Sequence, residues 1–144
     1  MSVAVVVPVR DQLDQTKALA ACLVAQTVPP VRVICLDDGS RRETKQWLRK
    51  APGWEAEDTD GLTIYEAWNR GFWLAGRGNP CEHVLIVNND VLLPPHALAA
   101  MSAALRADAS RVAAYPDWRA KWSQTRRQVP ENPVVAEREL KIEK

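Results

Sequence analysis

The sequence of 144 residues lacks the features that mark disulfide-rich, membrane-spanning or nucleic-acid-binding proteins. Its three cysteines are widely spaced and form no C-x-x-C motif, so neither a disulfide framework nor a zinc site is expected. Cys22 and Cys35 fall among apolar neighbours and are expected in the core. No apolar run approaches the roughly 20 residues of a membrane span. The net charge of +1 gives no general attraction to nucleic acid or anionic membranes.

The two commonest phosphate-binding loops are also missing. No G-x-G-x-x-G follows the first apolar run, and G-x-x-x-x-G-K-[ST] occurs nowhere in the chain. A ligand that carries a diphosphate would therefore be held in another way, and a bridging metal ion is the natural alternative. The apolar start "MSVAVVVPVRD" has no basic leader, so we expect a first strand there instead of a signal peptide. With the unpaired cysteines, this favours a cytoplasmic protein.

Short apolar runs alternate with segments of helical spacing along the chain. The runs that predict strands are residues 3–7, 31–36, 54–56, 84–87 and 112–115. The segments that predict helices are residues 11–26, 40–50, 63–75 and 94–108. Ser40 and Glu43 have the spacing of a capping box at the start of the second helix. Strands that are apolar on both faces and alternate with helices are typical of an α/β fold, with a mainly parallel sheet flanked by helices.

Polar side chains gather directly after three of the predicted strands. They are Arg10 and Asp11 after the first, Asp37 and Asp38 after the second, and Asn88, Asn89 and Asp90 after the fourth. In parallel sheets, ligands bind outside the carboxyl ends of the strands, so these side chains are expected at one rim. Their oxygens suit a divalent cation, or the hydroxyls and ring N–H of a nucleoside. Taken singly, "DDGS" and "NND" are also explained as turns at strand ends.

Four segments, taken in order, resemble the nucleotide-sugar-binding half of a family 2 glycosyltransferase with the Rossmann-like GT-A fold. They are "VAVVVPVRD", "QTVPPVRVICLDDGS", "AWNRG" and "HVLIVNNDVLLPPHAL", and the resemblance covers residues 3–116. It implies that Pro8 and Arg10 border the nucleobase pocket and that Asp38 hydrogen-bonds the base. It also implies that Asn69 of "AWNRG" lies close to the nucleotide.

The "NND" segment stands where the family has its Asp-x-Asp element. The resemblance implies that Asn88 replaces the first aspartate, that Asn89 lies near the ribose, and that Asp90 is the protein's ligand to Mn²⁺ or Mg²⁺. The implied activity is metal-dependent transfer of a sugar from a nucleoside-diphosphate sugar, with a UDP-sugar favoured, to an acceptor hydroxyl.

The chain departs from the family pattern after Pro116, where members continue into an acceptor-binding region that supplies the catalytic carboxylate. Here residues 117–144 follow, and we expect them to form a C-terminal arm, extended or in a short terminal helix, that pairs subunits or docks on the domain. Asp117 is the one candidate for the catalytic base. The alternative is a nucleotide-sugar-binding module that has no transferase activity or needs a partner chain. A nucleotidyltransferase is disfavoured, because "PVRDQLDQ" has no glycine.

Overall fold

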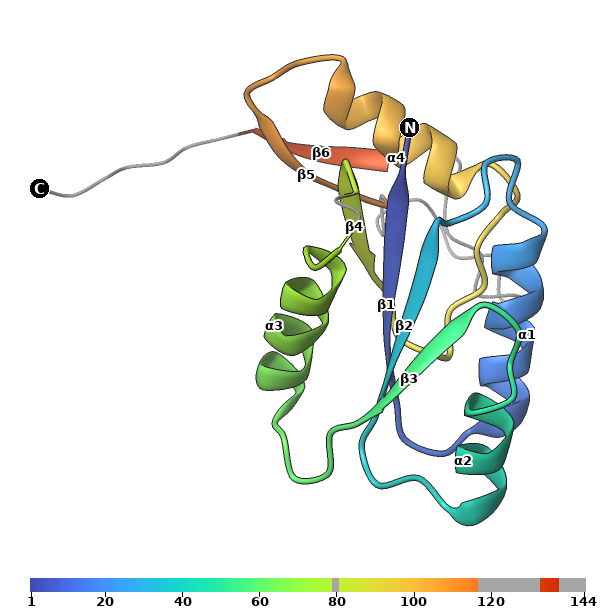
Figure 1. The fold of residues 1–144 in the computed structure, drawn as a ribbon. Coiled ribbons are helices and arrows are strands. Elements are labelled where there is room, and N and C mark those ends of the chain that lie inside the picture. The colour runs from blue at the N-terminus through green and yellow to red at the C-terminus, as the bar shows by residue number, and fades with distance from the viewer. Residues whose placement is uncertain (79–80, 117–132, 138–144) are drawn as a thin grey trace, which may run out of the picture.

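The structure, a computed structural model, describes residues 1–78, 81–116 and 133–137. Its main sheet has four parallel strands in the order β3-β2-β1-β4 (Figure 1). The strands are β1 (Val3–Val9), β2 (Arg32–Asp37), β3 (Trp54–Asp58) and β4 (His83–Ile86). The predicted parallel sheet and its α/β class are therefore confirmed.

Four helices cover the two faces of this sheet. They are α1 (Leu13–Val24), α2 (Arg42–Leu48), α3 (Ile64–Ala75) and α4 (Ala97–Arg106). α3 lies on one face, and α1 and α2 lie on the other (Figure 1). Among the described residues, no helix is long and apolar enough to cross a membrane.

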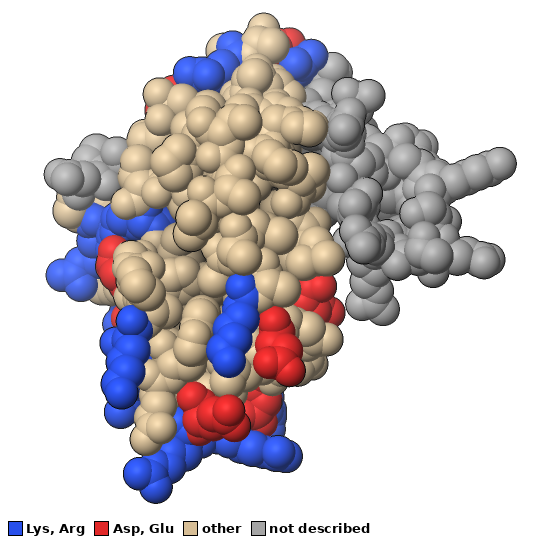
Figure 2. All heavy atoms as spheres, turned by 90° about the vertical axis from the view of Figure 1, so that its right-hand side faces the viewer, with Lys and Arg blue, Asp and Glu red and all other residues tan. Residues whose placement is uncertain are grey.

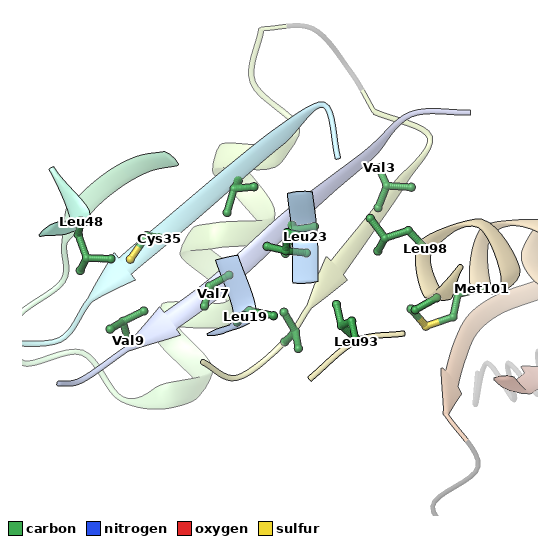
Figure 3. Packing of buried hydrophobic residues seen from close by; sticks show 14 residues of the cluster. Val3, Val7, Val9, Leu19, Leu23, Cys35, Leu48, Leu93, Leu98 and Met101 are labelled. Atoms are coloured by element: carbon green, nitrogen blue, oxygen red, sulfur yellow. The ribbon is translucent and has the colours of Figure 1, made fainter. Parts of the chain in front are cut away.

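The larger core cluster lies on the α1 side of the sheet. Val3, Val7 and Val9 of β1 belong to it, together with Leu19 and Leu23 of α1 (Figure 3). Alternate residues of a strand face opposite sides of a sheet, so the unbroken apolar run of β1 supplies both faces. Cys35 is fully buried in this cluster, which confirms its interpretation as a core residue, whereas Cys22 is partly buried and packs against the cluster from outside. Burial raises the pKa of the Cys35 thiol.

The α3 side is built from smaller residues. Ala67, Gly71 and Ala75 form the buried face of α3. A Cβ atom at Gly71 would overlap the side chain of Val6 and lie 3.0 Å from Leu36 Cδ1. The absence of a side chain at Gly71 thus lets α3 approach the sheet closely, at a point midway along the helix.

The predicted capping box at Ser40 and Glu43 is wrong. α2 begins after Arg41 without a side-chain cap, because the Ser40 hydroxyl instead accepts a hydrogen bond from the backbone N–H of Asp11 at 2.8 Å. A capping box does occur at α3, where Thr63 and Glu66 bond each other's backbone N–H groups. These contacts lower the pKa of the Glu66 carboxyl, chiefly through the backbone hydrogen bond from Thr63.

Two further predicted elements differ in detail. Pro94 and Pro95 were expected in the first turn of a helix, but α4 begins only after His96. A second sheet pairs β5 (Arg111–Pro116) antiparallel with β6 (Pro133–Glu137). β6 belongs to the segment expected as an arm, so this strand pair spans the domain boundary expected at residue 116. The other residues of that segment lie outside the described part of the chain.

Replacing Gly71 with alanine tests the close contact of α3 with the sheet. Because the added methyl group collides with Val6 and Leu36, we expect Gly71→Ala to lower the free energy of unfolding by about 1–3 kcal/mol in urea denaturation. Gly76→Ala is the matched control. Gly76 has right-handed helical angles, and its nearest neighbour to an added Cβ is 3.6 Å away. That variant should be as stable as the wild type or slightly more so; equal stability of all three proteins would contradict the close contact.

Candidate nucleotide-sugar site

A pocket of about 290 Å³ opens at the carboxyl ends of β1, β2 and β4. The chain adds β2 and then β3 on one side of β1 before it crosses to β4 on the other side. The pocket therefore lies at the point where the strand order reverses, which is the usual ligand site of open parallel sheets. Figure 2 shows acidic and basic side chains together at the lower end of the molecule, the end to which β1 runs in Figure 1.

Six of the predicted site residues meet in this pocket. They are Pro8, Arg10, Asp38, Asn88, Asn89 and Asp90. Asn69 does not join them, because it is exposed on α3 and is not among the residues that line the pocket. Asp117 lies outside the described residues.

Sequence reasoning missed an apolar wall of the pocket. Leu62 precedes α3, and Ile64 and Ala67 lie in its first turn. The T-x-x-E spacing of Thr63 and Glu66 was the available signal, because it places the start of α3 at the ligand end of the sheet. An apolar wall opposite carboxylates and amides suits a ligand with one flat, weakly polar part and one strongly polar part.

The two aspartates of "DDGS" have different roles. Asp37 is buried, and its Oδ1 accepts the backbone N–H of Ser40 at 3.0 Å, so it supports the loop from within. Asp38 lines the pocket, and its backbone N–H donates to the carbonyl of Val9 at 2.9 Å. This bond places the Asp38 side chain beside the end of β1.

Arg10 and Asp38 form an exposed ion pair across the pocket rim. Arg10 Nη1 lies 3.4 Å from Asp38 Oδ2, and the two side chains are 77% and 31% exposed. Ion pairs of this kind contribute little to stability, so both groups can turn towards a ligand at low cost.

The turn between β1 and α1 has an unusual backbone. Asp11 and Gln12 both have left-handed conformations, with φ of 57° and 55°. Such a conformation costs about 1–2 kcal/mol for a residue with a side chain. Gln12 lines the pocket, so the strained turn is part of the site. Aspartate adopts left-handed angles more readily than most residues, but "RDQL" has no glycine or asparagine, so the sequence is only a weak signal for this turn.

The oxygen donors of the pocket fit a hard cation that is shared with a ligand. Asp90 contributes a carboxylate and Asn88 an amide, and the Asp38 carboxylate lines the same pocket. Within the described ranges there is no group of three or more His, Cys, Asp or Glu that could enclose a metal ion. Mg²⁺ is commonly held by one or two carboxylates together with substrate phosphates, and this donor set matches that arrangement.

The sequence matches the model of glycosyl transferase family 2 over residues 4–142. The chain belongs to this family. The match confirms the family inferred from the four segments, and it continues past residue 116, where that resemblance was expected to end.

Thirty-three chains of known structure match the fold. One is the crystal structure of S. aureus TarS 1–349, which is 21% identical with a TM-score of 0.62. The match covers 74% of this chain and 33% of that one, so the family 2 chain described here spans about a third of the TarS structure. At this identity the likeness shows the GT-A fold alone. None of the curated proteins matches the sequence.

Glycine at position 12 tests the strain in the pocket turn. Because glycine adopts left-handed angles freely, we expect Gln12→Gly to raise the free energy of unfolding by about 0.5–1 kcal/mol. Lys17→Gly is the control, since Lys17 is exposed inside α1 and glycine there should cost about 1 kcal/mol. Urea denaturation compares the two, and a Gln12→Gly protein less stable than wild type would show that the turn is unstrained.

Proposed function

We propose that this family 2 domain binds a nucleoside-diphosphate sugar, with a UDP-sugar favoured, and transfers the sugar to an acceptor hydroxyl with the help of Mn²⁺ or Mg²⁺. One observation carries the proposal. Asp38 and Asp90, from the ends of two strands separated by β1, line one pocket together with Arg10. Family membership supports sugar transfer as the reaction class.

Each pocket residue has a proposed role in binding the donor. Pro8, Arg10 and the apolar wall border the nucleobase, and the Asp38 carboxylate accepts a hydrogen bond from a ring N–H. Asn88 and Asn89 face the ribose and phosphates, and Asp90 ligates the cation. Asn69 is also proposed to approach the nucleotide, from its exposed position on α3.

The reaction separates negative charge onto the departing nucleoside diphosphate. A cation held by Asp90 would supply charge neutralisation of that diphosphate. If the configuration of the sugar is inverted, a carboxylate must accept the proton of the attacking hydroxyl, and Asp117 is the proposed base. A retaining mechanism needs no base at that position.

Two variants separate base recognition from metal binding. Because Asp38→Ala removes a charged hydrogen-bond acceptor, we expect it to weaken UDP binding by about 10- to 100-fold with or without Mn²⁺, as measured by calorimetry. Asp90→Asn should abolish only the gain in affinity that Mn²⁺ provides. Asp14→Asn is the control, because Asp14 is an exposed carboxylate in the first turn of α1 that does not line the pocket. An Mn²⁺ effect that survives in Asp90→Asn would contradict the proposed metal ligand.

Donor turnover distinguishes the transferase from its alternative. That alternative is a nucleotide-sugar-binding module that has no transferase activity or needs a partner chain. We expect slow release of UDP when the protein is incubated with UDP-sugars and Mn²⁺, less release with GDP- and dTDP-sugars, and none with Asp90→Asn. Binding without any release, even by transfer to water, would favour the module.

Residues 117–144 are proposed to pair subunits or to dock on the domain. Apart from β6 they lie outside the described residues, so this role, the domain division at residue 116 and the cytoplasmic location stay predictions. Light scattering that shows a monomer at all concentrations would count against subunit pairing.

A further inference from the structure

Three buried polar side chains connect the loops that form the pocket. They are Thr16, Ser40 and Asn89, with exposed fractions of 0%, 5% and 9%, and we call them the clamp. Thr16 comes from α1, Ser40 follows β2, and Asn89 follows β4. The three residues come from three different segments, so their contacts join parts of the chain that are distant in the sequence.

Asn89 joins the loop after β4 to the left-handed turn. Its side-chain nitrogen donates to the carbonyl of Asp11 at 3.2 Å and to the Thr16 hydroxyl at 3.0 Å, which uses both hydrogens of the amide. The Thr16 hydroxyl in turn donates to the carbonyl of Gln12 at 3.1 Å. Both carbonyls of the strained turn are therefore bound by the clamp.

Ser40 joins the loop after β2 to the same turn. Its hydroxyl accepts the backbone N–H of Asp11 at 2.8 Å, and the Asp11 carboxylate accepts the backbone N–H of Arg41 at 2.7 Å. The turn is thus held from the β2 side by two short hydrogen bonds and from the β4 side by Asn89.

The clamp is directly connected to the residues that line the pocket, and Asn89 is itself one of them. The turn it holds carries Arg10 and Gln12, Ser40 stands two residues after Asp38, and Asn89 separates Asn88 from Asp90. Thr16 and Ser40 do not line the pocket themselves. A shift of a clamp residue would therefore move the pocket residues that are next to it in the chain or bonded to it. Thr16 and Ser40 themselves do not contact the ligand.

We propose that Thr16 and Ser40 are positioning residues that, together with the pocket residue Asn89, set nucleotide affinity by locking the three segments in one arrangement. This inference rests on the proposed function for the identity of the ligand. Its support is the pair of left-handed non-glycine residues, because a conformation of that kind persists only where its surroundings hold it, and strain of this kind gathers at binding sites. Thr16 and Ser40 act through the turn and not by touching the nucleotide.

Thr16 offers a matched pair of substitutions. Thr16→Val keeps the volume of the side chain but removes the hydroxyl that binds Asn89 and Gln12, so we expect UDP in the presence of Mn²⁺ to bind about 5- to 10-fold more weakly. Thr16→Ser keeps the hydroxyl and loses a buried methyl group, so it should bind UDP within about twofold of wild type although it melts at a lower temperature. Affinities that simply follow the melting temperatures of the two variants would overturn the proposal.

Two further variants serve as a control and as a second test of the clamp, Thr44→Val and Ser40→Ala respectively. Thr44 is a buried threonine of α2 outside the clamp, and its replacement should leave UDP affinity unchanged. Ser40→Ala removes the acceptor for the Asp11 N–H and should weaken UDP binding as Thr16→Val does. If either Thr16→Val or Ser40→Ala fails to fold, the other provides the same comparison with wild type.

Amide hydrogen exchange tests the clamp without any ligand. The N–H groups of Asp11 and Arg41 should exchange at least about tenfold faster in Thr16→Val than in Thr16→Ser, because only the valine variant releases the turn. Equal exchange in the two variants would refute the clamp. If the wild type binds none of UDP, GDP and dTDP, the proposed function fails, while the exchange rates still decide whether the three side chains hold the turn.

Discussion

The parallel pairing of β1 with β2 on one side and β4 on the other is the constraint on which the site depends. β1, β2 and β4 run in the same direction, with Val5 of β1 opposite Val33 of β2 and Leu85 of β4. Their carboxyl ends therefore lie at the same edge of the sheet. Because Val9 is opposite Asp37, the next residue, Asp38, emerges beside Arg10. Strand register brings these two charged side chains into contact, because the attraction within an exposed ion pair is too weak to do so.

The two faces of the sheet supply different parts of the site. The apolar wall of the pocket, Leu62, Ile64 and Ala67, comes from the start of α3 and the loop before it. The hydrogen bonds that hold the pocket turn lie towards α1, through Thr16. Ligand contact and loop support are thus supplied by different helices, so a change in the wall need not disturb the support beneath it.

The strands and the meeting of the polar residues could be predicted because both follow from patterns along the chain. The run Val3–Val9 is apolar at every position, short and rich in β-branched valine, a pattern typical of a strand covered on both faces. Once the strands are parallel, Asp38 and Asp90 must come to the same edge, and the structure places both in one pocket.

What could not be predicted depends on contacts between segments far apart in the sequence. Ser40 has the spacing of a helix cap, yet its hydroxyl bonds Asp11, which lies 29 positions earlier. The left-handed conformations of Asp11 and Gln12 are held in part by Ser40 and Asn89, two side chains from other loops. Asn69 was expected near the nucleotide by resemblance alone, and its place on α3 leaves it outside the pocket lining. Local sequence patterns predict the helices and strands, whereas these hydrogen bonds form only once distant segments are brought together in the fold.

Gly71 has a consequence that reaches beyond packing. It sits two turns along α3 from Ile64 and one turn from Ala67, the two helix residues that bound the pocket. The distance between α3 and the sheet therefore influences how far Ile64 and Ala67 lie from Asp38 and Asp90. A glycine that lies outside the pocket lining thus helps to set the width of the opening through the position of its helix.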